Sequence, residues 1–200
     1  MIWHISTVEY FQMGGWVMVP LSFLSILLAI MIAERFMYLS RLRSGDITTE
    51  TIIRGLETNK AVGGRNRDGI HSRLLARYLS ARSSYGRIDE GIIEEVAKSF
   101  FLELKENLRV IGTLTSLAPL LGLLGTVSGM ITTFNVMTIF GTGNAKAMSG
   151  GISEAMITTQ FGLVVAILGL FCNSVIQRRT RRCERVIKEV GHQILRKFQK

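Results

Sequence analysis

Three long stretches without a charged side chain constrain this chain more than any other feature of its sequence. They run over 14–33, 110–145 and 155–177. A helix needs about 20 mostly apolar residues to cross the roughly 30 Å hydrocarbon layer of a bilayer, and each stretch is long enough. The charged fraction of 20% also lies below the value of about 25% typical of soluble domains. We therefore predict an all-α chain with three transmembrane helices.

The basic residues are distributed unevenly around these stretches. The first fifteen residues contain no Lys or Arg, and the stretch 141–151 contains only Lys146. All other basic residues lie between Arg35 and Arg109 or from Arg178 onward. Because cytoplasmic loops are the ones enriched in Lys and Arg, this pattern predicts an external N-terminus and a cytoplasmic C-terminus. It also accounts for the net charge of +9 without nucleic-acid binding, which we do not expect.

These features predict the order of segments along the chain. Helical periodicity in 89–109, with an apolar residue every three or four positions, predicts a cytoplasmic helix that continues into the second span, because no helix breaker intervenes before Gly112. Shorter helices are expected over 47–58 and 68–80. The predicted segments are an external segment (1–14), transmembrane helix one (15–38), a cytoplasmic helical segment (39–109), transmembrane helix two (110–140), a periplasmic turn (141–153), transmembrane helix three (154–177) and a basic cytoplasmic tail helix (178–200).

The second and third spans are rich in glycine and threonine. Pro119 is expected to kink the second span, and Ser153 is expected to be the N-cap of the third, with Glu154 in its first turn. Glycines at helical spacing allow neighbouring membrane helices to approach closely. The residues that form these small, weakly polar faces are Gly122, Gly125, Thr126, Gly129 and Thr133 in the second span and Thr158, Thr159, Gly162 and Gly169 in the third.

Two interpretations of these threonines stay open from the residues alone. They can serve only for packing, since a threonine hydroxyl can bond to its own helix backbone. Alternatively, Thr126 and Thr159, together with Thr133 and Thr158 and with Glu154 at the outer mouth, line a narrow hydrated path. A hydroxyl cannot store a proton near neutral pH, and neither span holds a titratable carboxylate at membrane depth. Either the chain moves no protons, or another chain supplies the acid.

Other functional classes find little support in the sequence. No nucleophile–base pair, phosphate-binding loop or metal-ligand spacing is present, so we expect neither an enzyme nor a cofactor or metal. Cys172 and Cys183 both fall on the predicted cytoplasmic side, where a disulfide is not expected. The basic residues at the end of the third span either anchor its orientation or bind anionic lipid heads; they are Arg178, Arg179, Arg181 and Arg182.

The second and third spans together resemble the MotA/TolQ/ExbB proton-channel family, and the ExbB branch in particular. The motifs that carry the resemblance are APLLGLLGTVSGM at Ala118–Met130 and GGISEAMITTQFGLVVAI at Gly150–Ile167. The family's pore threonines correspond to Thr126 and Thr159, its acid at the start of the third span to Glu154, and its proline to Pro119. Residues 41–90 carry no such match.

The resemblance implies a homopentamer around a central pore lined by spans two and three, in the bacterial inner membrane. It implies a single-span partner similar to ExbD or TolR, whose membrane aspartate supplies the missing titratable group. It further implies that the proton motive force powers uptake across the outer membrane through a TonB-like protein.

This sequence departs from the family pattern at two positions. Ser128 stands where some members have an aromatic residue, and Gln160 where a small residue is common; both bear on pore wetting. A TolQ-like role in envelope maintenance is the alternative within the family. A membrane scaffold that conducts nothing is the alternative from another class.

Overall fold

The computed structural model describes residues 13–43, 70, 73–74, 76–78, 80 and 90–198. Its elements are the helices α2 (Met18–Arg43), α5 (Glu90–Lys105), α6 (Leu108–Phe140) and α7 (Ala145–Phe198), and no described residue lies in a strand. Three regions of these helices are long and apolar enough to cross a membrane: Met18–Leu42, Glu94–Phe140 and Met148–Gln193. The prediction of an all-α chain with three such helices is confirmed for the described residues, whereas residues 1–12 and the predicted helix over 47–58 lie outside them.

The chain divides into two compact units. The apolar unit contains Met1–Ile32 and Arg109–Asn173, and the charged unit contains Ala33–Leu108 and Ser174–Lys200. Each unit therefore combines segments that are far apart in the sequence, because α2 and α7 begin in the first unit and end in the second.

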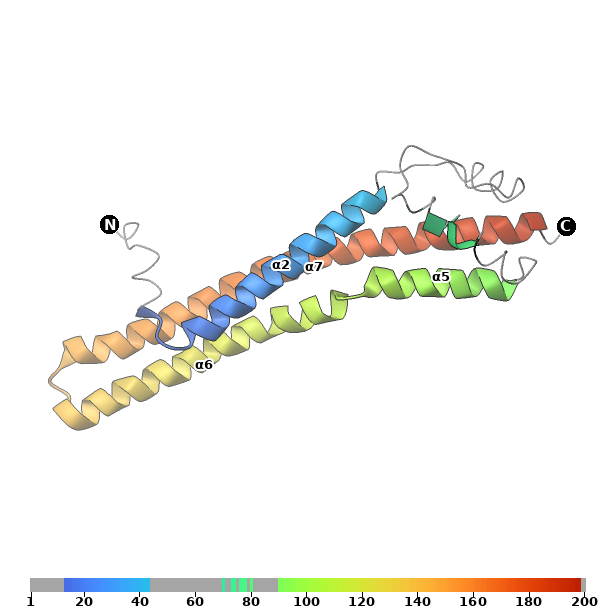
Figure 1. The fold of residues 1–200 in the computed structure, drawn as a ribbon. Coiled ribbons are helices and arrows are strands. Elements are labelled where there is room, and N and C mark those ends of the chain that lie inside the picture. Colours follow the sequence, from blue (N-terminus) through green and yellow to red (C-terminus); the bar gives the residue numbers. More distant parts are fainter. Residues whose placement is uncertain are drawn as a thin grey trace. The chain divides into compact units, whose positions relative to one another are not determined.

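In the apolar unit, α6 and the first part of α7 are antiparallel and joined by a short turn (Figure 1). The N-terminal turn before α2 has Gly15 in the left-handed region, with a φ of 67°, and the Met18 amide donates to the Gly15 carbonyl at 3.2 Å. Pro20 lies in the first turn of α2, where the missing amide hydrogen costs little. We predicted the first span over 15–38, and the helix runs from Met18 to Arg43.

The helices α6 and α7 approach so closely that side chains on the contact face must be small. A Cβ added at Gly162 would lie 2.8 Å from the Ala118 carbonyl oxygen and 3.1 Å from the Gly122 Cα. Contacts this short exclude any residue larger than glycine unless the backbone moves. The buried face of α6 has one residue every three or four positions, namely Ile111, Thr115, Ala118, Gly122, Gly125, Gly129 and Thr133.

The start of α7 corrects two predictions. Its first residue is Ala145, so most of the predicted periplasmic turn over 141–153 is helical, and only 141–144 connect the helices. Ser153 is therefore not an N-cap, and Glu154 lies about three turns into the helix, where its charge gains little from the dipole. The sequence Gly150-Gly151 suggested a break, but Gly151 is buried against the α6 backbone, and this packing favours a helix through this position.

The end of α7 follows the prediction. A single helix of 54 residues continues through the basic tail to Phe198. In the charged unit, the C-terminal part of α7 packs on α5. The Lys105 ammonium lies 2.9 Å from a Glu184 carboxylate oxygen, and the Lys188 ammonium lies 5.8 Å from the centre of the Phe101 ring.

The predicted continuous helix from 89 into the second span is interrupted. The helix α5 ends at Lys105, and α6 begins at Leu108. Between them, Asn107 has a φ of 61°, and asparagine tolerates this left-handed conformation better than most residues. The predicted apolar face of α5 is otherwise as expected, with Val96, Phe100 and Leu104 buried. The described residues between Ile70 and Ser80 are helical, which agrees with the helix expected over 68–80.

Candidate functional site

Two of the predicted site threonines are buried between α6 and α7. Thr133 is 3% exposed and Thr158 is fully buried. Each hydroxyl donates to its own helix, Thr133 to the Gly129 carbonyl at 3.0 Å and Thr158 to the Ala155 carbonyl at 3.0 Å. Such bonds satisfy a hydroxyl in an apolar contact. In this structure Thr133 and Thr158 therefore belong to the helix packing and not to an open surface.

Thr126 and Thr159 lie at the edge of the same contact and are half-buried. The Thr159 hydroxyl donates across the interface to the Gly122 carbonyl at 3.2 Å. Thr126, one turn after Gly122, donates to the Leu123 carbonyl at 2.7 Å. Each oxygen keeps lone pairs that can accept a hydrogen bond from a water molecule or a protonated carboxyl group.

The other side of the α6–α7 pair is occupied by the N-terminal turn. The Trp16 indole donates to the Ser128 hydroxyl at 3.1 Å, and Gly15 lies directly against the Glu154 carboxylate. Ser128 is two positions from Thr126, which places the two about 160° apart around α6. By the same geometry, Glu154 and Thr159 are about 140° apart around α7. The structure thus separates Glu154 from the two edge threonines.

The glycines and the proline predicted for packing lie on or beside this contact. A Cβ added at Gly129 would lie 2.8 Å from the Ala155 amide nitrogen, and one at Gly169 would lie 2.8 Å from the Thr115 side chain. Gly125 faces the Thr158 side chain. Pro119 lies inside α6, which continues through it as a helix.

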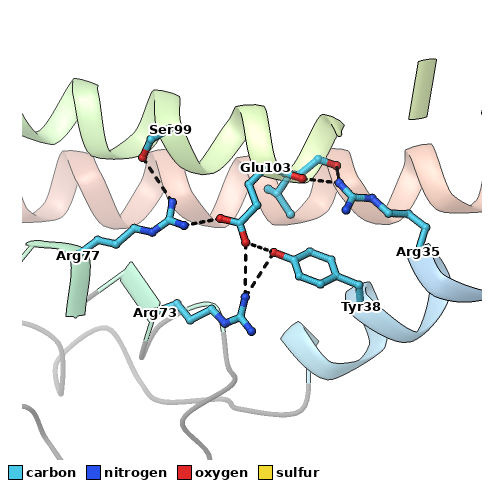
Figure 2. Close-up of polar contacts among 7 residues, drawn as sticks. Arg35, Tyr38, Arg73, Arg77, Ser99 and Glu103 are labelled. Carbon is cyan, nitrogen blue, oxygen red and sulfur yellow. Dashed lines mark hydrogen bonds and ion pairs between the residues drawn. The ribbon is translucent and has the colours of Figure 1, made fainter. Parts of the chain in front are cut away.

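A cluster of charged side chains in the charged unit was not predicted. One Glu103 carboxylate oxygen accepts a hydrogen bond from the Tyr38 hydroxyl and lies 3.5 Å from the Arg73 guanidinium. The other oxygen accepts a hydrogen bond from Arg77, which also donates to the Ser99 hydroxyl at 3.4 Å. Figure 2 shows these side chains converging on Glu103. The carboxylate connects α2, the helical residues near 70–80 and α5.

Arg35 binds the end of α5 in the same cluster (Figure 2). Its side chain is only 6% exposed, and it donates to the carbonyl oxygens of Glu103 and Leu104. These carbonyls lie in the last turn of α5 and have no acceptor role within the helix. A cation at this position also complements the negative end of the helix dipole. The Arg35 guanidinium further lies 5.0 Å from the centre of the Tyr38 ring.

The hydrogen-bonding and charged partners of Glu103 affect its pKa more than its burial does. Although burial acts to raise the pKa of Glu103, hydrogen bonds from Tyr38 and Arg77 and the charges of Arg77 and Arg73 lower it below its usual value. Glu103 lies before the predicted second span, on the side that the charge distribution predicts to be cytoplasmic. It is therefore an ionised structural anchor near neutral pH.

The basic residues that follow the third span do not all have the same surroundings. The Arg179 guanidinium lies 4.3 Å from the centre of the Phe36 ring, whereas Arg178, Arg181 and Arg182 are exposed. No group of three or more His, Cys, Asp or Glu side chains suited to a metal ion occurs among the described residues. Cys172 and Cys183 are both unpaired thiols.

Sequence reasoning missed the Glu103 cluster and the Trp16–Ser128 bond. Glu103 and Tyr38 are 65 positions apart, and Trp16 and Ser128 are 112 apart. No local pattern connects residues at such separations. The only sequence signal was the isolated charged pair Glu34-Arg35 at the end of the first apolar stretch, of which Arg35 is buried and Glu34 is exposed.

The helices and the uncharged α6–α7 contact define a class of protein, namely a multi-pass helical membrane protein. Comparison with known proteins makes this assignment specific. Residues 66–189 match the model of the MotA/TolQ/ExbB proton channel family, and the chain belongs to this family.

The curated relatives agree with this assignment. The putative biopolymer transport protein ExbB-like 1 of Synechocystis sp. is 34% identical over 176 residues, which cover 84% of this chain and 69% of the relative. ExbB-like 3 of the same organism is 30% identical over 188 residues and covers 90% of both chains. The biopolymer transport protein ExbB of Aquifex aeolicus is 35% identical over 109 residues, 54% of this chain and 69% of the relative.

Proposed function

We propose that this chain is the proton-channel subunit of an inner-membrane complex that uses the proton motive force to power TonB-dependent uptake across the outer membrane. The observation that carries the proposal is the position of Thr126 and Thr159. Both lie at the edge of the α6–α7 contact, on the side away from the N-terminal turn, and both retain acceptor lone pairs.

The edge threonines are suited to face a titratable group of another chain. Neither the second nor the third uncharged stretch supplies a carboxylate, and Glu154 lies on the opposite side of α7 from Thr159. We propose that an ExbD- or TolR-like single-span protein supplies a membrane aspartate next to these hydroxyls. A homopentamer of this chain would surround the single membrane helix of that partner. A TonB-like protein would transmit the energy of proton flow to the outer membrane.

The five predicted path residues then divide into three roles. Thr126 and Thr159 face the path and exchange hydrogen bonds with water and the partner's carboxyl group. Thr133 and Thr158 lie behind them and hold α6 against α7. Glu154 lies beside Gly15, about three turns into α7, and its negative charge attracts protons toward the outer mouth of the path.

The branch of the family is supported by the relatives. All three relatives described above carry ExbB in their names, and this favours transport across the outer membrane over a TolQ-like role. Deletion of the gene distinguishes the two. Loss of uptake of iron complexes supports the ExbB-like role, whereas detergent sensitivity with normal uptake supports the TolQ-like role.

Proton flux through the assembled complex tests the channel itself. Thr126→Val and Thr159→Val preserve shape and remove the hydroxyl. A hydrogen bond to a charged group contributes about 1.5–3 kcal/mol, so each change should lower flux by about tenfold or more. The measurement is acidification of liposomes that contain the purified complex, followed with a pH-sensitive dye.

Thr132→Val is the matched control. Thr132 is exposed on the same helix, and its hydroxyl donates to the Ser128 carbonyl at 3.2 Å, so its loss should leave flux unchanged. Wild-type flux in both the Thr126 and Thr159 variants, with normal assembly, would contradict the channel and favour a scaffold that conducts nothing.

A further inference from the structure

The cytoplasmic part of α7 has one strongly basic face. Among the described residues beyond the third span, six basic side chains are exposed, and they fall within about a third of the helix circumference. The opposite side of the same stretch is buried, with Ile176, Ile187 and Val190 in the core of the charged unit. We call the exposed set the basic face; its members are Arg178, Arg181, Arg182, Arg185, Lys188 and Arg196.

Two carboxylates of the described part of this stretch, Glu184 and Glu189, stand against the six cations of the basic face, and helical geometry places Glu189 within it. Glu184 on the same helix is engaged with Lys105 at 2.9 Å, and Glu189 is the one exposed acid among the described residues of this stretch. A second copy of the chain is a poor occupant, because each copy brings 24 Lys and Arg against 15 Asp and Glu. Self-association therefore enlarges the positive surplus.

Lipid headgroups reach only part of the basic face. The helix rises about 1.5 Å per residue, so Arg196 lies about 27 Å along the axis from Arg178. The headgroup layer on each side of a bilayer is only about 5–8 Å thick. With the predicted third span ending at 177, Arg178, Arg181 and Arg182 fall within this range of the membrane surface. Arg185, Lys188 and Arg196 extend beyond it, because α7 is one continuous helix to Phe198.

We propose that the distal half of the basic face, Arg185 to Arg196, binds an acidic segment of a partner polypeptide beside the cytoplasmic end of the membrane helices. This inference rests on the proposed function, because that function makes the chain one subunit of a complex. It adds the chemistry of the cytoplasmic segment that a partner would provide. An extended peptide rich in Asp and Glu matches both the sign and the length of a row of cations along one helix.

Direct binding tests the proposal independently of proton flux. Full-length protein in nanodiscs of phosphatidylcholine is titrated with a fluorescent peptide of alternating glutamate and serine, and binding is measured by anisotropy. The double variant Arg185→Glu with Arg196→Glu should weaken binding by about tenfold or more. Lys188 is left unchanged because it also lies over the Phe101 ring.

Two control variants locate the effect. Arg41→Glu reverses an exposed charge at the end of α2 and should leave peptide binding within about twofold of wild type. Arg181→Glu with Arg182→Glu should weaken association with liposomes containing phosphatidylglycerol more than it weakens peptide binding. Wild-type circular dichroism establishes that each variant is folded.

Several results would overturn the proposal. They are unchanged peptide binding in the distal double variant, an equal loss in Arg41→Glu, or equally tight binding of a DNA oligonucleotide of the same net charge. If the distal double variant lost association with phosphatidylglycerol liposomes but kept peptide binding, the distal half of the basic face would be assigned to lipid. None of these results changes the expected flux of the Thr126 and Thr159 variants, so this inference and the channel can fail separately.

Discussion

A single carboxylate at Glu103 joins three segments of the charged unit. Tyr38 comes from α2, Arg73 and Arg77 from the helical residues near 70–80, and Glu103 itself from α5. Surface ion pairs usually contribute little to stability. Here several partners share one carboxylate that is 28% exposed, so the network orders three segments at once.

Glu103→Gln should destabilise the protein by about 1 kcal/mol, a figure kept low because Arg73 and Arg77 are about one-third exposed and screened by solvent. The measurement is thermal unfolding in detergent, with Glu94→Gln as the control. Glu94 is exposed on the same helix, and its replacement should change the midpoint little.

The pH dependence of this difference follows from the lowered pKa of Glu103. A carboxylate whose folded pKa is depressed stabilises the protein above its unfolded pKa of about 4.3, and the contribution is lost as the pH falls through the folded pKa. The difference in stability between wild type and Glu103→Gln should therefore be constant from pH 7 to about 5 and disappear in stronger acid. A gap that widens in acid would contradict the assigned ion pairs.

At the scale of elements, the break between α5 and α6 is set by tertiary contacts. The residues around Lys105–Leu108 include neither glycine nor proline, so propensity alone predicts a continuous helix. Arg35 satisfies the last carbonyls of α5, and Asn107 adopts a positive φ of 61°. A polar interaction from α2 thereby replaces the hydrogen bonds that a continuous helix would have made.

Substitutions at Asn107 test this break. Alanine in a left-handed conformation costs about 1 kcal/mol or more, whereas glycine does not. Asn107→Gly should therefore have a higher thermal midpoint than Asn107→Ala, measured by circular dichroism in detergent. In a continuous helix the order reverses, because alanine is then favoured by about 0.5–1 kcal/mol. An alanine variant more stable than the glycine variant would show that the break is absent.

The same scale explains why α7 is longer at its start than predicted. Glycine pairs commonly end helices, and Gly150-Gly151 suggested a loop. Gly151 instead lies against the α6 backbone and the Thr133 side chain. The energy of this close contact is available only to a helix that already has α6 as its neighbour.

At the scale of the whole molecule, the asymmetry of basic residues predicts an external turn over 141–144 and a cytoplasmic α7 end. Single cysteines in a chain with Cys172 and Cys183 changed to serine test this orientation. Thr142→Cys should react with a membrane-impermeant maleimide in intact spheroplasts. Arg185→Cys should react only after permeabilisation. The reverse labelling pattern would contradict the predicted orientation and place the basic face outside.

The sequence by itself determined the helical class, the three membrane-crossing helices and the family. These follow from uncharged length, from the sign of flanking charges and from local motifs, all of which are properties of neighbouring residues. Tertiary structure alone decided which threonines are enclosed and which lie at the edge, and where α5 ends. Thr126 and Thr133 belong to one face in a helical projection, but α7 lies directly against Thr133 at Gly151 and buries it, whereas Thr126 stays partly exposed. Burial depends on the neighbouring helix, and a single-helix pattern does not contain it.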